Sequence, residues 1–356
     1  MPISSPLPND TRSKTADWLE ILCLCSARGL ATKADLLGIY DVLGDPDDHE
    51  LEADDTTGEP LEEEILEDRR AELADDILDE LQYRSDTLKD QYPFELRVRG
   101  QQWQLLPSAP SADLLAMAGR RCYVFCLLNS AIRDKSIRGK DITGRNETPV
   151  ERAMADHFQV ISAEAAADFI GGDVISFGWP RPGGTAFQPA LKDVSQKLAL
   201  GKPLETVPLW ASGREKDAGI DVIAWRDFVD FRPGKLILLG QVASGNNWKG
   251  KSVESDTSHF FSWFSERPTK HYIPAIFIPF PQHHECQGKK NEEFEAVAAA
   301  QAWLREQEFG LVLDRLRIIG HAARRLTRHG YTHGATALNE VGTWNDQVIG
   351  MARATA

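Results

Sequence analysis

The chain has 356 residues, 42% of them apolar, which excludes a disordered protein and allows one large globular domain or two ordinary ones. It contains no run of about 18 uncharged apolar residues and no apolar leader, so we expect a protein without a membrane segment that stays in the cytoplasm. Its net charge of −14 argues against a uniformly basic surface for nucleic acid.

The acidic charge is concentrated in one segment. Residues 41–90 contain 21 Asp and Glu against four Lys and Arg, a net charge of −17, which leaves about +3 for the rest of the chain. A segment of this kind is typical of a solvated loop together with one face of a helix. The alternatives are a mimic of nucleic acid or a docking surface for a basic partner.

Region 1–135 is expected to be a mostly helical N-terminal domain with one hairpin. Apolar residues recur with helical spacing in 16–27, 32–43, 61–83 and 112–132. Two short extended runs, 94–98 and 102–106, are joined by Arg99-Gly100, which is compatible with a turn. Four of the five cysteines lie in the helical stretches, where free thiols pack as small hydrophobic groups, so we expect no disulfides.

Region 136–330 predicts alternating helices and strands. Pro149 is tolerated in a first helical turn and opens a helix that Gly171-Gly172 ends. Strands are expected at 173–179, 219–225, 235–242 and 272–280, and further helices at 187–200, 257–265 and 291–306.

The two central strands of this region are apolar on both faces, as in a sheet covered by helices on each side. We therefore expect an α/β fold with a mixed central sheet flanked by helices. The mostly helical N-terminal domain precedes it, and a weakly patterned tail, 331–356, follows.

The ends of the expected strands carry oxygen-bearing side chains. A nuclease that uses Mg²⁺ holds the ion with carboxylates and other oxygen ligands while a water attacks phosphorus. Asp221 lies at one end of the second strand and Gln241 at the end of the third, and an acid on the preceding helix can reach the same point. The sequence therefore offers candidates at all three positions.

These strands also resemble a known family. Asp217-Ala-Gly-Ile-Asp-Val-Ile, followed by Gly234-Lys-Leu-Ile-Leu-Leu-Gly-Gln-Val-Ala-Ser-Gly, resembles the PD-(D/E)XK, or restriction-endonuclease-like, nuclease superfamily. The closest branch has Gly-hydrophobic-Asp-hydrophobic-hydrophobic, a hairpin, and then Gln-x-Lys. The resemblance covers residues 147–306 and rests on these motifs, the strand order and the 20-residue spacing from Asp221 to Gln241.

The resemblance implies a DNA endonuclease that depends on Mg²⁺ or Mn²⁺, of a build that commonly serves bacterial restriction or anti-phage defence. Asp221 is then the metal-binding aspartate and Gln241 the second ligand, in the place often taken by glutamate. Glu151, on the helix that Pro149 opens, is the helix-borne acid and third metal ligand, with Glu147 as the alternative.

Each of these residues also has a structural interpretation. Asp221 can cap a strand end, and Gln241 can be a buried amide that satisfies backbone groups. Glu151 stands in a first helical turn, where the helix dipole favours an acid in any protein.

One position departs from the family pattern. The catalytic lysine is expected two residues after Gln241, where this chain has Ala243. Either the lysine has migrated, to Lys249 with Lys251 and Lys216 as alternatives, or the site no longer cleaves DNA. If it does not cleave DNA, the protein would be a non-catalytic, nuclease-like interaction subunit of a multi-protein complex. In both cases we expect the N-terminal region to contact a protein partner.

Other groups have a structural explanation. His283-His-Glu-Cys286 offers four metal-ligating side chains, but adjacent residues on a loop rarely close a tetrahedral site. Trp248 and Trp263 have the ring faces that stack on bases, yet we expect them to pack in the core. The run Asp314-Arg-Leu-Arg is expected to form an internal ion pair.

Overall fold

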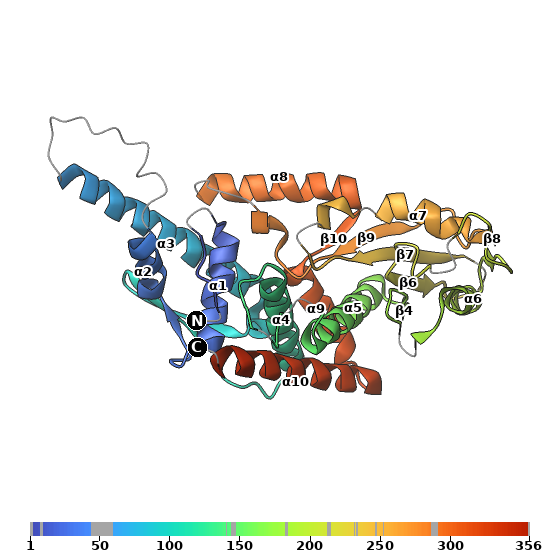
Figure 1. Ribbon diagram of the computed structural model, residues 1–356, viewed down its shortest axis with the longest axis horizontal. Helices are drawn as coiled ribbons and strands as arrows, with labels where there is room; N and C mark the ends of the chain where they lie inside the picture. Colours follow the sequence, from blue (N-terminus) through green and yellow to red (C-terminus); the bar gives the residue numbers. More distant parts are fainter. Residues whose placement is uncertain are drawn as a thin grey trace.

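The computed structural model is a mixed α/β structure with helices at one end and a central sheet at the other (Figure 1). It describes residues 3–7, 10–43, 60–139, 141–143, 147–181, 184–211, 215–230, 232, 234–245, 248–251, 253–285 and 291–354. In these ranges, no helix is long and apolar enough to cross a membrane.

The N-terminal region consists of helices and a small antiparallel sheet of order β1-β3-β2. The elements are α1 (Arg12–Cys25), β1 (Ala31–Thr32), α2 (Lys33–Leu43), α3 (Pro60–Leu88), the 3₁₀ helix η2 (Lys89–Gln91), β2 (Phe94–Arg99), β3 (Gln102–Pro107) and α4 (Leu114–Arg133). The predicted hairpin is confirmed, since β2 pairs with β3.

The acidic segment is described only in part, because residues 44–59 lie outside the described ranges. It continues into α3, whose exposed face carries Glu72, Asp75 and Asp79. The opposite face is buried through Ala74, Ile77 and Leu81, as its apolar spacing predicts.

The second region follows the predicted order of helices and strands. Its elements are α5 (Pro149–Ile170), β4 (Asp173–Ser176), α6 (Phe187–Leu198), β5 (Lys202–Pro203), β6 (Val222–Asp227), β7 (Lys235–Val242), η4 (Trp248–Gly250), α7 (Val253–Ser262), β8 (Phe264–Glu266), β9 (Ile273–Phe277), η5 (Gln282–Glu285), α8 (Asn291–Phe309), β10 (Leu311–Leu313), α9 (Arg315–Leu326) and α10 (Thr332–Ala354).

Local sequence explains where α5 begins and ends. Thr148 accepts a hydrogen bond from the Glu151 amide and Glu151 accepts one from the Thr148 amide, which forms a capping box. Gly171 closes the helix with φ of 68°, a conformation that glycine adopts without strain. Helix α7 differs from the prediction: it begins at Val253, four residues before Thr257, and residues 264–266 leave it as β8.

The central sheet has the order β10-β9-β7-β6-β4. Strands β4, β6 and β7 are antiparallel neighbours, whereas β7, β9 and β10 run parallel. Helix α5 lies on one face and packs against α9, while α7 and α8 lie on the other face (Figure 1). The sheet is therefore mixed and covered on both sides, as predicted.

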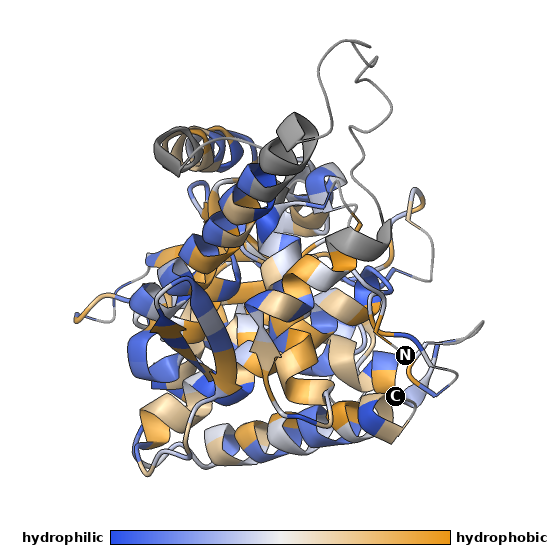
Figure 2. Cartoon of the chain, turned by 90° about the vertical axis from the view of Figure 1, so that its left-hand side faces the viewer, coloured by the Kyte–Doolittle hydropathy of each residue, from blue (hydrophilic) through white to orange (hydrophobic). Residues whose placement is uncertain are grey.

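The side chains of β6 alternate between two buried clusters. Val222 and Ala224 belong to the cluster that includes α5, and Ile223 and Trp225 to the cluster that includes α7. This period of two is what a strand buried on both faces requires. In Figure 2 the hydrophobic residues gather in the interior of the molecule and the hydrophilic ones lie mostly on its outer faces.

The chain end that the sequence left weakly patterned is the helix α10. It packs on α4, α5 and α1, and Arg353 donates to the Leu24 carbonyl at 2.7 and 3.0 Å. The same buried cluster runs from α1 through α4 and α5 to α10. It includes Cys23, Cys25, Cys122 and Cys126, while Cys286 lies outside the described residues.

A buried network of charges joins the N-terminal helices to α9. Arg315 donates to Asp17 Oδ2 at 2.7 Å, whereas Asp314 accepts the Arg317 and Gln282 amides, so the buried ion pair joins this run to α1 rather than forming within the run. Arg84 contacts Asp17, Glu20 and Glu80 at 2.6, 3.1 and 2.7 Å. Both guanidinium groups are completely buried.

Candidate functional site

Asp221 and Gln241 lie next to each other at one end of the sheet. Val222 pairs with Gly240 in the β6–β7 register, and the Asp221 amide donates to the Gly240 carbonyl at 2.9 Å. By strand alternation, Asp221 lies on the side of Ile223 and Gln241 on the side of Leu239, which is the face that α7 covers. The structure therefore brings these two predicted residues together.

The Asp221 carboxylate is enclosed by backbone. Its Oδ2 accepts the Val242 amide at 2.8 Å. A Cβ on Gly178 would stand 2.3 Å from Asp221 Oδ1, so only glycine leaves room for the carboxylate. Burial raises the pKa of Asp221 to about 6, against the opposing effect of the Val242 hydrogen bond.

Gln241 has one satisfied and one unsatisfied end. Its Nε2 lies 3.4 Å from Asp256 Oδ2, and the residue is only 8% exposed. Its Oε1 is buried and has no hydrogen-bond partner among the described residues. Buried polar atoms are nearly always paired, so among the described residues this oxygen is available to a further ligand.

Asp256 is a member of the site that sequence reasoning missed. It lies in the first turn of α7, and a Cβ on Gly219 would stand 2.5 Å from its Cγ. Burial raises its pKa, and the Gln241 hydrogen bond opposes the shift. The signal was the short run Glu254-Ser-Asp256 before the apolar residues of α7, because acids favour a first helical turn.

The charge of Lys251, one of the three candidate lysines, acts on the site. It lowers the pKa of both Asp221 and Asp256, although burial and the neighbouring carboxylates raise both values overall. Lys251 is half-buried, whereas Lys249 in η4 and Lys216 are exposed. Asn246 and Asn247, which precede η4, lie outside the described residues.

The structure does not bring Glu151 to this point. Its carboxylate accepts the Thr148 amide at 2.9 Å, in the capping box of α5. Gln159 is the α5 residue near the site, about 12 Å farther along the helix axis. Gln159 donates to the Gly178 carbonyl at 3.1 Å. The alternative acid, Glu147, is exposed and pairs with Arg152 at 3.5 Å.

Other predicted ligands are engaged elsewhere or absent from the site. No three His, Cys, Asp or Glu side chains of the described residues are grouped so that they could hold a metal ion. His283 lies 2.9 Å from both carboxylate oxygens of Glu80. Trp248 and Trp263 are 2% and 1% exposed, which confirms that they pack in the core.

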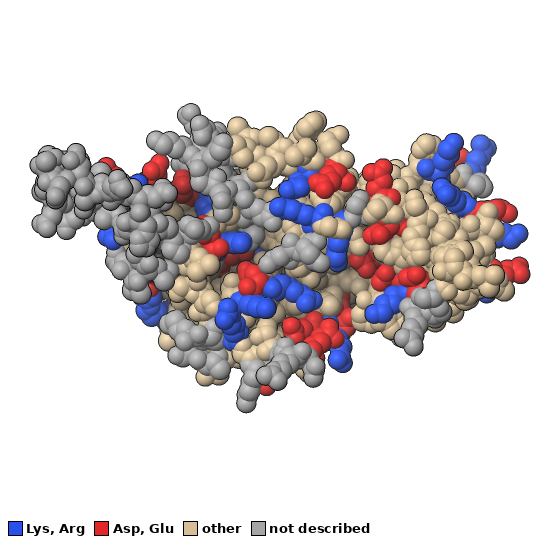
Figure 3. All heavy atoms as spheres, turned by 45° about the horizontal axis from the view of Figure 1, so that its top comes forward, with Lys and Arg blue, Asp and Glu red and all other residues tan. Residues whose placement is uncertain are grey.

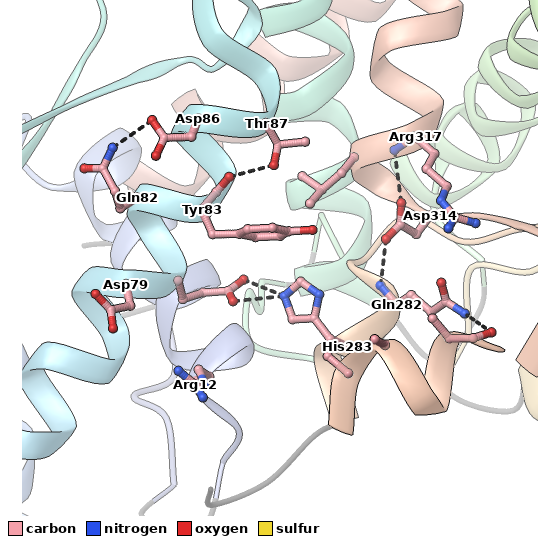
Figure 4. Close-up of a pocket in the computed structure, with 15 residues that line it drawn as sticks. Arg12, Asp79, Gln82, Tyr83, Asp86, Thr87, Gln282, His283, Asp314 and Arg317 are labelled. Atoms are coloured by element: carbon pink, nitrogen blue, oxygen red, sulfur yellow. Dashed lines mark hydrogen bonds and ion pairs between the residues drawn. The ribbon is translucent and has the colours of Figure 1, made fainter. Parts of the chain in front are cut away.

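A separate cavity of about 850 Å³ opens between α3, η5, α8 and the start of α9. Figure 4 shows Tyr83 on α3 facing His283 and Asp314. Its polar groups largely bind one another: Asp86 accepts Gln82 Nε2 at 2.9 Å, and Asp314 caps α9. Its described lining comes from α1, α3, η5, α8 and α9, and not from β6 or β7. We therefore do not place the chemistry there.

The surface charge is mixed. On the face drawn in Figure 3, the Lys and Arg side chains of the described residues lie interspersed with Asp and Glu. Phosphate binding on this face would therefore depend on individual cations rather than on a broad basic surface.

Comparison with known proteins adds no assignment. No family model matches the chain, and no curated protein or solved structure matches it either. The candidate site depends on the residues of this chain alone.

Proposed function

We propose that the chain is a metal-dependent endonuclease with a restriction-endonuclease-like core, which hydrolyses DNA phosphodiesters beside Asp221 and Gln241. The observation that carries the proposal is their pairing at one sheet end, with a buried Gln241 oxygen that has no partner among the described residues. Leaving such an oxygen unpaired costs about 1–3 kcal/mol. A divalent cation bound by both side chains would offset this cost.

The residues present fit Mg²⁺ or Mn²⁺. Both ions prefer carboxylate and carbonyl oxygens, and Asp221, Asp256 and Gln241 offer such oxygens. Besides burial, Asp217 and Asp256 raise the pKa of Asp221, and Asp217 raises that of Asp256, so a cation beside these carboxylates would be favoured. When bound, the cation supplies charge that activates a water and stabilises the developing negative charge on phosphate.

The chain's own residues hold and orient the reacting groups. The Val242 amide fixes the Asp221 carboxylate, and Gln241 Nε2 holds the Asp256 carboxylate. The charge of Lys251 lowers the pKa of both acids. Its ammonium would stabilise charge on the phosphate, the role of the lysine that Ala243 replaces. Ala243 itself is buried against the Trp248 cluster.

The strand order supports the same proposal. The antiparallel run β4-β6-β7, then α7, then β9 parallel to β7, follows the order in which the family resemblance places an aspartate on the second strand and its partner ligand on the third. The topology alone specifies no chemistry, so the site residues carry the functional argument.

The proposal is tested by incubating the purified chain with plasmid, linear duplex and single-stranded DNA, with Mg²⁺, Mn²⁺ or chelator. We expect metal-dependent cleavage that Asp221→Ala and Gln241→Ala each abolish. Asp230→Ala is the matched control, because Asp230 is exposed and lies in the β6–β7 hairpin at the opposite end of these strands.

The outcomes separate the alternatives. Cleavage that survives both substitutions would place the chemistry elsewhere. No cleavage, together with a metal-induced thermal shift that Asp221→Ala removes, would indicate a cation site that needs a partner for activity. Neither cleavage nor metal binding would favour the interaction subunit, whose support is Ala243 at the lysine position.

The lysine assignment has its own test. Lys251→Ala should lower cleavage at least about 100-fold, because one charged donor at a transition state contributes this much. Lys249→Ala, two residues away on the exposed η4 turn, should stay within a few-fold of the unmodified protein. Equal losses would show that proximity in sequence, not position in the site, determines the effect.

A further inference from the structure

Two half-exposed tryptophans lie beside the candidate site. Trp179 is 42% and Trp210 is 54% exposed. The segment before Trp210 adds Val207, 46% exposed, and Leu209, which is fully exposed. Large apolar side chains that stay in water next to a polar site mark a binding surface rather than a core.

The backbone at Trp179 lies beside Asp221. It follows Gly178, the glycine that makes room for the Asp221 carboxylate. The Gly178 amide donates to the Asp221 carbonyl at 2.9 Å, and the Trp179 amide lies 3.4 Å from Asp217 Oδ2. The backbone of Trp179 is therefore one residue from the groups that surround Asp221.

Trp210 contacts α7, the helix that carries Asp256. Its ring packs against His259 in a T-shaped contact with centroids 5.7 Å apart. His259 lies one helical turn after Asp256 on α7 and pairs with Glu215 at 2.9 Å. Glu215 and Asp217 belong to the same short segment before β6, which contacts the Trp179 amide directly and the Trp210 ring through His259.

The chemistry of this surface fits unpaired nucleobases. Indole rings stack on any base, and each such contact contributes enough to change affinity about tenfold or more. The Arg181 guanidinium lies 5.6 Å from the Trp179 ring centroid; it is buried and donates to the Phe177 and Lys216 carbonyls, so it supports the indole from the protein side. Paired bases inside a duplex do not expose their faces to such rings.

We infer that Trp179 and Trp210 form a stacking site for unpaired nucleobases, so that the substrate is DNA with single-stranded nucleotides beside the phosphate at Asp221. The inference rests on the proposed function, since it names the substrate class of that site. It also predicts nucleic-acid binding that does not require cleavage.

The test measures binding with cleavage switched off. The Asp221→Asn variant, in chelator, is titrated against labelled short single strands, a duplex of the same sequence, and a duplex with a few unpaired bases. We expect Trp179→Ala and Trp210→Ala, each in this background, to weaken single-strand binding about tenfold and to leave the duplex nearly unchanged. Trp179→Phe, which keeps a ring, should restore most of the affinity.

Trp303→Ala is the matched control, because Trp303 is 64% exposed on α8, on a different element. Equal weakening by this variant, no weakening by the site variants, or the same effect on duplex as on single strands would overturn the inference. A change of oligomeric state in Trp210→Ala without an effect on DNA would assign the surface to protein contact instead. If the protein cleaves DNA and the tryptophan substitutions have no effect, the stacking site is overturned and the endonuclease is not. If the tryptophans determine binding but the protein does not cleave DNA, the endonuclease is overturned and the stacking site is not.

Discussion

At the scale of single residues, burial determines the chemistry of Asp221. An aspartate in water is ionised well below neutral pH, whereas burial raises the pKa of Asp221 to about 6. The pKa of Asp221 therefore lies close to physiological pH, and ionising the buried carboxylate has a free-energy cost that a bound cation would reduce. Gln241 is uncharged, so it adds no like charge beside the buried Asp221 carboxylate.

The pKa shift predicts how stability depends on pH without metal. The folded state binds the Asp221 proton more tightly than the unfolded chain, so the free energy of unfolding falls as pH rises from about 4 through 6, by up to about 3 kcal/mol. Asp221→Asn lacks this ionisation. Denaturation in chelator should show the variant gaining stability relative to the unmodified protein above pH 6, but not near pH 4.

Added Mg²⁺ should reverse this order, because only the ionised carboxylate binds the cation. Mg²⁺ should raise the thermal stability of the unmodified protein above pH 6, and this gain should disappear as the pH falls below 6. Mg²⁺ should not stabilise Asp221→Asn at any pH. A stability difference that does not vary with pH would contradict the burial argument.

At the scale of elements, helix α5 contributes to the site through Gln159 and not through the predicted Glu151. Its first turn carries Glu151, which completes the capping box, while Gln159, two turns later, faces the site. A carboxylate that accepts a backbone amide at a helix start stabilises the helix, and this contact accounts for Glu151 without a metal.

Glu151→Ala is therefore expected to lower the free energy of unfolding by about 1 kcal/mol, the usual effect of losing a helix cap. Cleavage per folded molecule should not change. Thr148→Ala removes the other half of the capping box and should act alike. Chemical denaturation and cleavage assays on the same samples check this, and a large loss of cleavage with unchanged stability would return Glu151 to the site.

At the scale of the whole molecule, buried ion pairs connect the N-terminal helices α1 and α3 with α9 near the end of the chain. Asp17 in α1 is bound by Arg315 of α9 and by Arg84 of α3. Removing one partner of a buried pair leaves a charge without compensation in a medium where water cannot reach it. The N-terminal helices and the sheet should consequently unfold together.

Arg315→Ala is expected to destabilise the protein by about 3–5 kcal/mol. Arg317→Ala, two residues later, should cost less than about 1 kcal/mol, because its pair with Glu306 is largely exposed. Urea titrations followed by tryptophan fluorescence and by circular dichroism measure both. Similar effects of the two substitutions, or separate transitions for the two probes, would contradict unfolding as one cooperative unit.

Much of the fold follows from local sequence. Helix α5 has the predicted ends because Pro149 fixes a helical φ at its start and Gly171 permits the left-handed conformation that closes it. Strand β7 has its predicted bounds because both of its faces are apolar. The β2–β3 hairpin and the burial of the helical cysteines follow in the same way, since period and turn chemistry are properties of neighbouring residues.

The sequence by itself determined the element order and the pairing of Asp221 with Gln241, because strand period and a short hairpin fix which residues share a sheet end. Only the tertiary structure decided which residues join them. Asp256 enters from a helix whose start was misplaced, the charge of Lys251 acts on both acids, and Trp179 and Trp210 stay exposed beside them. These contacts connect residues that are separated in the chain, and no local pattern records which ones packing brings together.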